Sequence, residues 1–428
     1  MKNYGNEEWL KLDNAAKIYP ANASKRDTRV FRFSCQLKKI VDKKTLQAAT
    51  NKTLEQFPYY KSVLKKGLFW YYLEFSDIKP IVCEEHEPVC APIYDKNQKN
   101  LLFKVTYFKK RINLEVFHAL SDGAGAVEFL RALIANYLVL KYPIKFSEQE
   151  IDLGYNASIS DKMDDSFHKY YDNHGSKKKS SFPIAHTLNG HKHKENRIEI
   201  IEGIASTKEI KAMAKKYNTT ITILLTAIMM SSINETMTLK ERRRPVVITV
   251  PVNLRQYFKS LSARNFFGVF NVGYNFSKQQ DELEDIISYL NNFFEEKLNY
   301  EQMSAIINSM TSLEKNIILR SVPIFIKDIV LKIAYLLSDR ISTASLSNVG
   351  VINFPKIFDE YIELFDVSIS TNRIQMCMCS YNDHLVMSFS SPLKNTNIQK
   401  NFFRTLANEG IKLNIASNFP LKEDESFE

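Results

Sequence analysis

One polar, basic segment near the middle of the chain constrains the fold more than any other feature. Residues 161–197 hold few apolar side chains and include the run Lys177–Ser181, together with scattered glycines and histidines. This composition is typical of a linker. Strand-like and helix-like patterns mix on both sides of it. We therefore expect an α/β chain with an N-terminal lobe at residues 1–165, a linker at 166–196 and a C-terminal lobe at 197–428.

The composition supports two folded lobes and excludes several classes of protein. The chain has 428 residues, of which 44% are hydrophobic, with only 12 glycines and 13 prolines. That much apolar side chain can fill two cores, and it rules out disordered or collagen-like chains. The five cysteines are odd in number and scattered, so no disulfide framework is expected. A reducing, cytoplasmic compartment is the simplest interpretation.

Metal-site and membrane signals are weak in this sequence. There is no C-x-x-C pair, the histidines lack zinc-ligand spacing, and we expect no metal site. Residues 1–10 are polar, and the longest apolar stretch, residues 221–233, is too short to span a bilayer. Residues 322–337 carry Lys327, Asp328 and Lys332, which predicts an amphipathic helix. We expect a monomer with no transmembrane segment.

Hydrophobic periodicity predicts the order of the elements. Before the linker it predicts strands at 28–37, 101–108 and 112–118 and helices at 45–57 and 125–140. After the linker it predicts a strand near 198, helices at 206–217 and 219–237, and a strand at 246–252. Three helices are then expected within 281–341, four strands at 343–351, 363–370, 374–381 and 384–390, and a closing helix at 396–413.

The junction between the strand at 112–118 and the following helix carries candidate chemistry. His118 alternates with Leu114 and Val116, so its side chain should point toward the core. A partly buried neutral imidazole can act as a general base, although spacing alone fits a packed core histidine better. Asp122 lies across a turn that Gly123 makes easy, and it can orient His118, tighten the turn or pair with a distant arginine. The small residues 124–126 allow a substrate or another backbone to approach.

His118, Asp122 and Gly123 stand as the pattern HxxxDG. This pattern resembles the signature of CoA- or carrier-dependent acyltransferases. That superfamily includes chloramphenicol acetyltransferase, the BAHD plant enzymes, condensation domains, wax ester synthases and microbial alcohol acetyltransferases. The segments VPVNLR (Val250–Arg255), NFFG (Asn265–Gly268) and SNVG (Ser347–Gly350) resemble alcohol acetyltransferases most closely. Phe117 replaces the extra histidine of condensation domains, and no DFGWG element is present, so O-acyl transfer is favoured.

The resemblance implies a fold of two chloramphenicol-acetyltransferase-like lobes, each a mixed sheet flanked by helices, with a tunnel between them. It implies an acyltransferase that moves an acyl group, such as acetyl, from a CoA thioester to an alcohol. His118 would be the general base, and no covalent intermediate or permanently bound cofactor is needed. Asp122 and Arg255 match the aspartate and arginine that pair structurally in the family.

Other site assignments are less specific. Ser347 or Asn348 can donate to the oxyanion of the tetrahedral intermediate, or the SNVG segment can be a strand bend. Asn265 and Asn271 are candidates for the tunnel lining. Four neighbouring aromatic residues fit a core better, namely Phe266, Phe267, Phe270 and Tyr274.

Two alternatives to a CoA-dependent alcohol acetyltransferase remain open on the sequence. One is a condensation-type or wax-ester-type enzyme that uses an acyl carrier protein or a long-chain acyl-CoA. The other is a catalytically silent scaffold of the same fold. Residues 201–264 hold eleven Lys and Arg against four Asp and Glu. These cations are either a solvated face or a mouth for the phosphates of CoA, and no nucleic-acid motif accompanies them.

Overall fold

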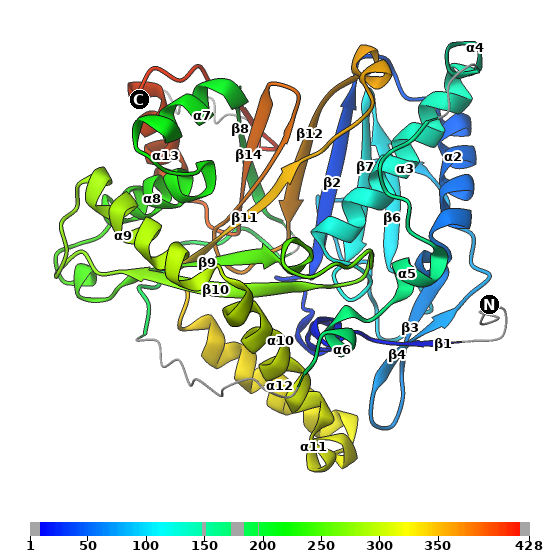
Figure 1. Ribbon diagram of the computed structural model, residues 1–428, viewed down its shortest axis with the longest axis horizontal. Helices are drawn as coiled ribbons and strands as arrows, with labels where there is room; N and C mark the ends of the chain where they lie inside the picture. Colours follow the sequence, from blue (N-terminus) through cyan, green and yellow to red (C-terminus); the bar gives the residue numbers. More distant parts are fainter. Residues whose placement is uncertain (1–8, 148–150, 173–183, 196, 420–428) are drawn as a thin grey trace, which may run out of the picture.

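The computed structural model describes residues 9–147, 151–172, 184–195 and 197–419, and it contains two large mixed sheets (Figure 1). The first sheet has the strand order β12-β2-β7-β6-β5. Its strands are β12 (Ile362–Ile369), β2 (Val30–Leu37), β7 (Arg111–Phe117), β6 (Phe103–Phe108) and β5 (Cys83–Glu84). Helices α2 (Lys43–Gln56) and α3 (Gly123–Lys141) pack against it and share its core.

The second sheet has seven strands in the order β10-β9-β11-β13-β14-β8-β15. These are β10 (Phe267–Tyr274), β9 (Val246–Asn253), β11 (Ala344–Val351), β13 (Gln375–Tyr381), β14 (His384–Ser391), β8 (Glu199–Ser206) and β15 (Asn414–Ser417). Helices α7 (Thr207–Lys216), α8 (Ile221–Asn234), α9 (Leu283–Lys297) and α13 (Asn397–Asn408) supply its second core. The fold is therefore the two-lobed α/β architecture that the resemblance implies.

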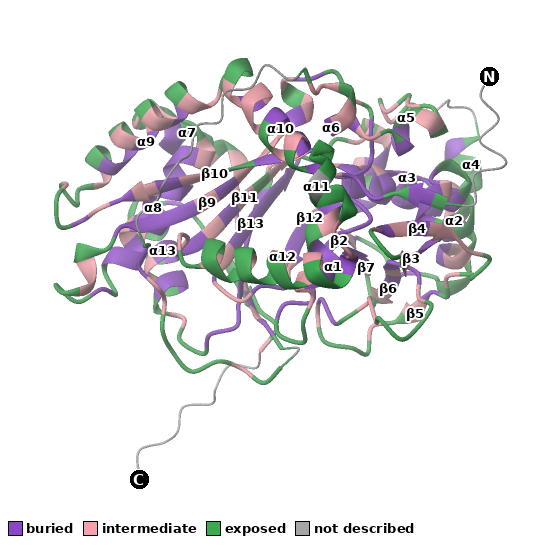
Figure 2. Ribbon diagram, turned by 90° about the horizontal axis from the view of Figure 1, so that it is seen from below, coloured by how far each residue is buried: buried purple, intermediate pink, exposed green. Residues whose placement is uncertain are grey.

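Strand β13 joins the two cores, because its two faces belong to different ones. Met376 and Met378 pack into the core of the second sheet, whereas Cys377 and Cys379 pack into the core of the first. A strand buried on both faces reads as a nearly continuous apolar run, as β13 does. Figure 2 shows β9, β12 and β13 as mainly buried strands between the helices.

A third, smaller sheet lies at the edge of the first lobe. It has the order β1-β4-β3, formed by β1 (Trp9–Lys11), β4 (Tyr71–Phe75) and β3 (Ser62–Lys66). Helices α10 (Tyr300–Lys315), α11 (Ile317–Ser321) and α12 (Ile324–Asp339) extend from the second lobe toward it (Figure 1). Among the described residues, α3 alone is long and apolar enough to cross a membrane, and 72% of its apolar window is buried in the core.

Several elements differ from the sequence predictions. Strand β12 follows the linker in sequence, yet it pairs antiparallel with β2 in the first sheet. The division at residues 165 and 197 stays a prediction, and this pairing shows that the chain crosses between the sheets. The helical region 281–341 forms four helices, because Asn316 and the segment before Pro323 interrupt it. The closing helix ends at Asn408, and β15 follows.

Candidate functional site

The candidate site lies where three segments meet between the two sheets. These are the end of β7, the start of α3 and a loop, residues 254–266, that connects β9 to β10. A cavity of about 140 Å³ opens there. Its lining includes the predicted site residues His118, Asp122, Gly123, Ser347 and Asn348.

His118 is held firmly at the end of β7. Its backbone N–H donates to the carbonyl of Arg29, with an N–O distance of 2.9 Å. Its ring stacks on Tyr19 with 4.4 Å between centroids, and Phe31 contacts it edge-on at 5.0 Å. Burial lowers the pKa of His118 below the ordinary histidine value, and the charge of Asp122 partly opposes this shift. The imidazole is therefore neutral at pH 7 and able to accept a proton.

A buried aspartate and an asparagine hold the Nδ1 side of the His118 ring. His118 Nδ1 lies 3.1 Å from Asn265 Oδ1. The backbone N–H and the side-chain amide of Asn265 both donate to Asp13 Oδ2, at 3.3 and 3.2 Å. Burial raises the pKa of Asp13 to about 6, against the opposing charge of Arg264. Both oxygens of the Asp13 carboxyl group accept from N–H groups, Oδ2 from Asn265 and Oδ1 from the backbone of Ala16 at 2.8 Å, so Asp13 acts here as a hydrogen-bond acceptor.

This chain of contacts assigns the histidine tautomer. Because Asp13 accepts from the amide nitrogen of Asn265, the Asn265 oxygen must face His118. An oxygen acceptor requires a proton on His118 Nδ1, which leaves the lone pair on Nε2. Nε2 is then the ring nitrogen that is available as a general base.

Asp122 forms the predicted ion pair with Arg255. Arg255 Nη1 lies 2.8 Å from Asp122 Oδ2, and Nη2 lies 3.3 Å from Oδ1. The same carboxylate accepts from the backbone N–H groups of Gly125 and Phe266, at 2.9 and 2.8 Å. Arg255 also donates to the carbonyls of Ser262 and Phe266. The pair therefore fastens the loop at residues 254–266 to the N-terminus of α3 and braces the turn behind His118.

Glycine at position 125 is required by the close approach of that loop. A Cβ at this position would lie 1.9 Å from the carbonyl oxygen of Ala263 and 2.5 Å from Ser121 Oγ. Of the two partners that the sequence allows at residues 124–126, a substrate or another backbone, the structure places another backbone there. Gly123 differs from the expectation, because its φ is not positive and the turn does not need a glycine. It lines the cavity instead.

We expect Gly125→Ala to lower the free energy of unfolding by about 3 kcal/mol, since the methyl group must displace backbone that has no room to move. The midpoint of urea unfolding measures this loss. Gly123→Ala is the matched control, because a Cβ there meets only the Phe33 ring at 3.8 Å, and its midpoint should barely change. Equal stability of the two variants would contradict the close approach.

The SNVG segment contains a bend in strand β11. The register between β11 and β13 shifts between Asn348 and Gly350, and Gly350 has φ +91°. The Asn348 side chain supports the bend, because its oxygen accepts from the Gly350 N–H at 2.8 Å and its nitrogen donates to Thr222 at 2.9 Å. Ser347 is half-buried and lines the cavity. The bend is present, and Ser347 is the better candidate for an oxyanion donor.

Three sequence assignments around the tunnel are corrected by the structure. Asn265 is buried, its side-chain oxygen contacts His118 and its side-chain nitrogen donates to Asp13. It therefore does not line the cavity. Asn271 accepts a hydrogen bond from Thr249 on the neighbouring strand and is also not in the lining. Phe267, expected in the core, lines the cavity with its ring centroid 5.8 Å from that of His118.

No sequence pattern marks Asp13 or Tyr19 as a residue of the site. They lie about 100 residues before His118, in a stretch without a recognisable motif. Only the buried position of Asp13 marks it as unusual. Among the described residues, no group of three or more His, Cys, Asp or Glu side chains is arranged to hold a metal ion.

Comparison with known proteins identifies what the chain resembles. A family model described as alcohol acetyltransferase matches residues 166–406. No curated protein matches the sequence. The fold is similar to that of polyketide synthase associated protein 5 from Mycobacterium tuberculosis, with 13% identity and a TM-score of 0.60 over 93% of this chain and 96% of that one.

Two fungal structures are similar to the same extent. Trichothecene 15-O-acetyltransferase from Fusarium sporotrichioides has 10% identity and a TM-score of 0.61, covering 93% of each chain. TRI101 from Fusarium graminearum, solved with coenzyme A and T-2 mycotoxin, has 10% identity and a TM-score of 0.62, covering 95% of this chain and 99% of that one.

Proposed function

Because the chain belongs to the alcohol acetyltransferase family and is an acyltransferase, we propose that it transfers a short acyl group from acyl-CoA to an alcohol, with His118 as general base. The observation that carries this proposal is the tautomer of His118. Its Nδ1 is held by Asn265 and Asp13, so Nε2 is the basic nitrogen of a residue that lines the cavity between the lobes.

In the proposed reaction, His118 Nε2 takes the proton of the acceptor hydroxyl as the oxygen attacks the thioester carbonyl carbon. The tetrahedral intermediate places negative charge on the former carbonyl oxygen, where Ser347 is the proposed hydrogen-bond donor. The intermediate then collapses, the carbon–sulfur bond breaks, and the imidazolium returns its proton to the leaving thiolate. The carboxylate of Asp122 stabilises that imidazolium, since its charge favours the protonated form. The products are an ester and free coenzyme A.

The size of the cavity supports a short acyl group. Its volume is about 140 Å³, close to the roughly 150 Å³ of an engineered protein cavity that holds one benzene molecule. An acetyl thioester and the reacting end of a small alcohol fit such a space, which favours a short acyl group. TRI101, a protein of the same fold, was solved with coenzyme A, which supports a CoA donor here.

The proposal is tested by following free thiol while purified protein is incubated with acetyl-CoA and longer acyl-CoAs against a panel of alcohols and amines. We expect release that depends on the alcohol and is fastest with acetyl-CoA. Release from a long-chain acyl-CoA alone would contradict the cavity argument. The absence of release from every CoA donor, with transfer from an acylated carrier protein, would reject the CoA donor.

The lowered pKa of His118 predicts the pH dependence of the reaction. A base works only when neutral, and burial keeps this imidazole neutral to a lower pH than an ordinary histidine near 6.5. We therefore expect kcat/KM to be constant at neutral and alkaline pH and to fall to half of its maximum only below pH 6.5. A profile in which kcat/KM still rises well above pH 7 would show that another group supplies the base.

A further inference from the structure

Helix α12 is amphipathic, as its sequence predicts, but its apolar face points away from the protein. Six outward side chains are each between 54% and 63% exposed, namely Phe325, Ile329, Val330, Ile333, Leu336 and Leu337. Figure 2, which views the molecule from below, shows α12 as a mainly exposed helix. The helix has 16 residues, so the apolar stripe runs for about 24 Å. In an ordinary surface helix the apolar face is buried.

The side of α12 that faces the body of the protein buries Ile324 and carries two carboxylates that pair with cationic side chains. Asp328 accepts from Lys66 and from the hydroxyl of Tyr71, at 3.0 and 2.9 Å. Asp339, at the other end, pairs with Arg373 at 2.7 Å. These contacts fix the rotation of the helix about its axis, so the apolar stripe cannot turn inward without breaking both ion pairs.

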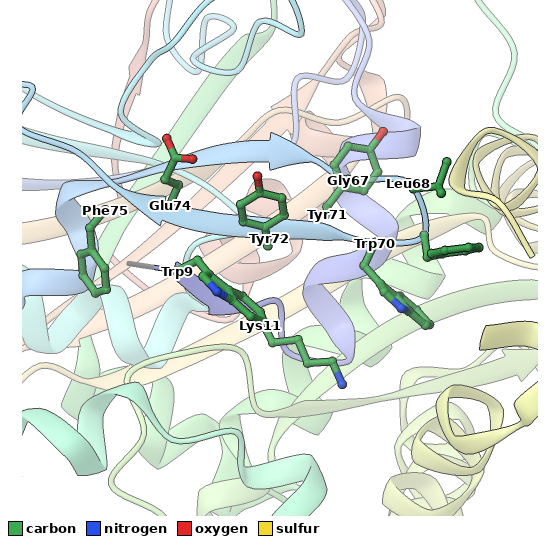
Figure 3. A pocket seen from close by; sticks show the side chains of 10 residues that line it. Trp9, Lys11, Gly67, Leu68, Trp70, Tyr71, Tyr72, Glu74 and Phe75 are labelled. Atoms are coloured by element: carbon green, nitrogen blue, oxygen red, sulfur yellow. The ribbon is translucent and has the colours of Figure 1, made fainter. Parts of the chain in front are cut away.

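Aromatic side chains extend the apolar surface beyond the N-terminus of α12. The N–H of Ile324 donates to the carbonyl of Leu68 in the β3–β4 turn, which places exposed Leu68 and Phe69 beside the helix. The turn opens into a hollow of about 750 Å³, where Figure 3 shows Trp9 and Trp70 on the same side of β4. Figure 1 places this turn and α12 at the same end of the molecule. Tryptophan at the edge of an apolar surface is typical of a membrane interface.

The charges around the stripe are positive. Lys332 in the middle of α12 and Arg340 directly after the helix are exposed, as is Arg320 in the preceding α11. The two carboxylates of α12 face inward, where cationic side chains pair with them. An apolar helical stripe flanked by outward cations matches the apolar interior and anionic headgroups of a lipid surface.

We propose that α12 and the β3–β4 turn dock this protein on an anionic lipid surface, with the outward side chains of α12 inserted among the acyl chains. The docking is independent of the transfer chemistry, because none of these side chains lines the cavity at His118. Docking would place the protein at the surface where apolar alcohols concentrate.

The proposal is tested by sedimenting the protein with vesicles of two parts phosphatidylcholine to one part phosphatidylserine. We expect the wild type to bind these vesicles, and the variant Ile329→Ser, Ile333→Ser, Leu336→Ser to bind at least ~10-fold more weakly. The variant Lys332→Gln, Arg340→Gln should lose ~10-fold in affinity and its preference for anionic over pure phosphatidylcholine vesicles.

The matched control replaces three exposed apolar residues elsewhere, Ile81, Ile144 and Leu239, with serine. It should bind vesicles like the wild type, and thermal unfolding verifies that every variant is folded. Failure of the wild type to bind, or equal binding by the α12 variant and the control, would overturn the proposal. So would light scattering that shows a dimer which only the α12 variant dissociates, because the stripe would then be covered by a second copy.

Discussion

The Asp122→Asn variant should unfold with a free energy about 3 kcal/mol below that of the wild type, and it should lose most of its acyl transfer activity. The carboxylate of Asp122 accepts hydrogen bonds from two backbone N–H groups and from two nitrogens of Arg255. An amide replaces one of these acceptors with a donor and removes the charge that Arg255 faces. Breaking a buried ion pair on one side costs ~3–5 kcal/mol because the remaining charge has no partner.

Asp122 both caps helix α3 and pairs with Arg255, so a control must measure the contribution of a cap alone. Asp42 is the matched control, since it also caps a helix through its side chain, accepting from the Thr45 N–H at 2.7 Å, but it is exposed. Asparagine is as good a cap as aspartate, so Asp42→Asn should change the urea midpoint very little. If Asp122→Asn unfolds at the same midpoint as Asp42→Asn and keeps its activity, the bracing role of the ion pair is wrong.

The His118→Ala variant should lower kcat/KM by about 10³-fold, because the alcohol then lacks a base at the reacting oxygen. General-base contributions are typically ~10²–10⁴-fold. The variant should keep its fold, since the ion pair of Asp122 with Arg255 does not involve the imidazole. Initial rates of thiol release with a saturating alcohol measure the change.

The exposed histidine His86 supplies a control for this experiment. His86→Ala should retain wild-type kcat/KM, so that a general effect of removing a histidine is excluded. A His118→Ala variant within ~10-fold of the wild type, with normal thermal unfolding, would contradict the assignment of the base.

Much of the fold could be predicted because its elements have strong local patterns. The alternation of Ile112, Leu114 and Val116 predicts β7, and the apolar spacing after Gly125 predicts α3. Strand β10 was missed, because Gly268 and Gly273 and a polar Asn271 break its alternation. The pairing of β12 with β2 could not be predicted, since it joins residues more than 300 positions apart.

In the candidate site, too, the residues that lie in sequence motifs could be predicted and the long-range contacts could not. His118, Asp122 and Arg255 lie in motifs, and the structure brings them together. Asp13 orients His118 through Asn265, which lies on a loop that crosses between the lobes. Hydrophobic periodicity cannot predict such a long-range contact. The NFFG motif correctly marks Asn265 as a residue near the site, but the predicted tunnel-lining position is wrong. Its side chain contacts Nδ1 of His118 on the side away from the cavity.

In the proposed reaction the acyl group passes directly from the thioester to the alcohol, and His118 acts as a base that never carries the acyl group. Initial velocities measured while acyl-CoA and alcohol are both varied test it most directly. Direct transfer requires both substrates in the cavity at once, so the double-reciprocal lines should intersect. Parallel lines, with an acylated protein detected by mass spectrometry in the absence of alcohol, would contradict the claim.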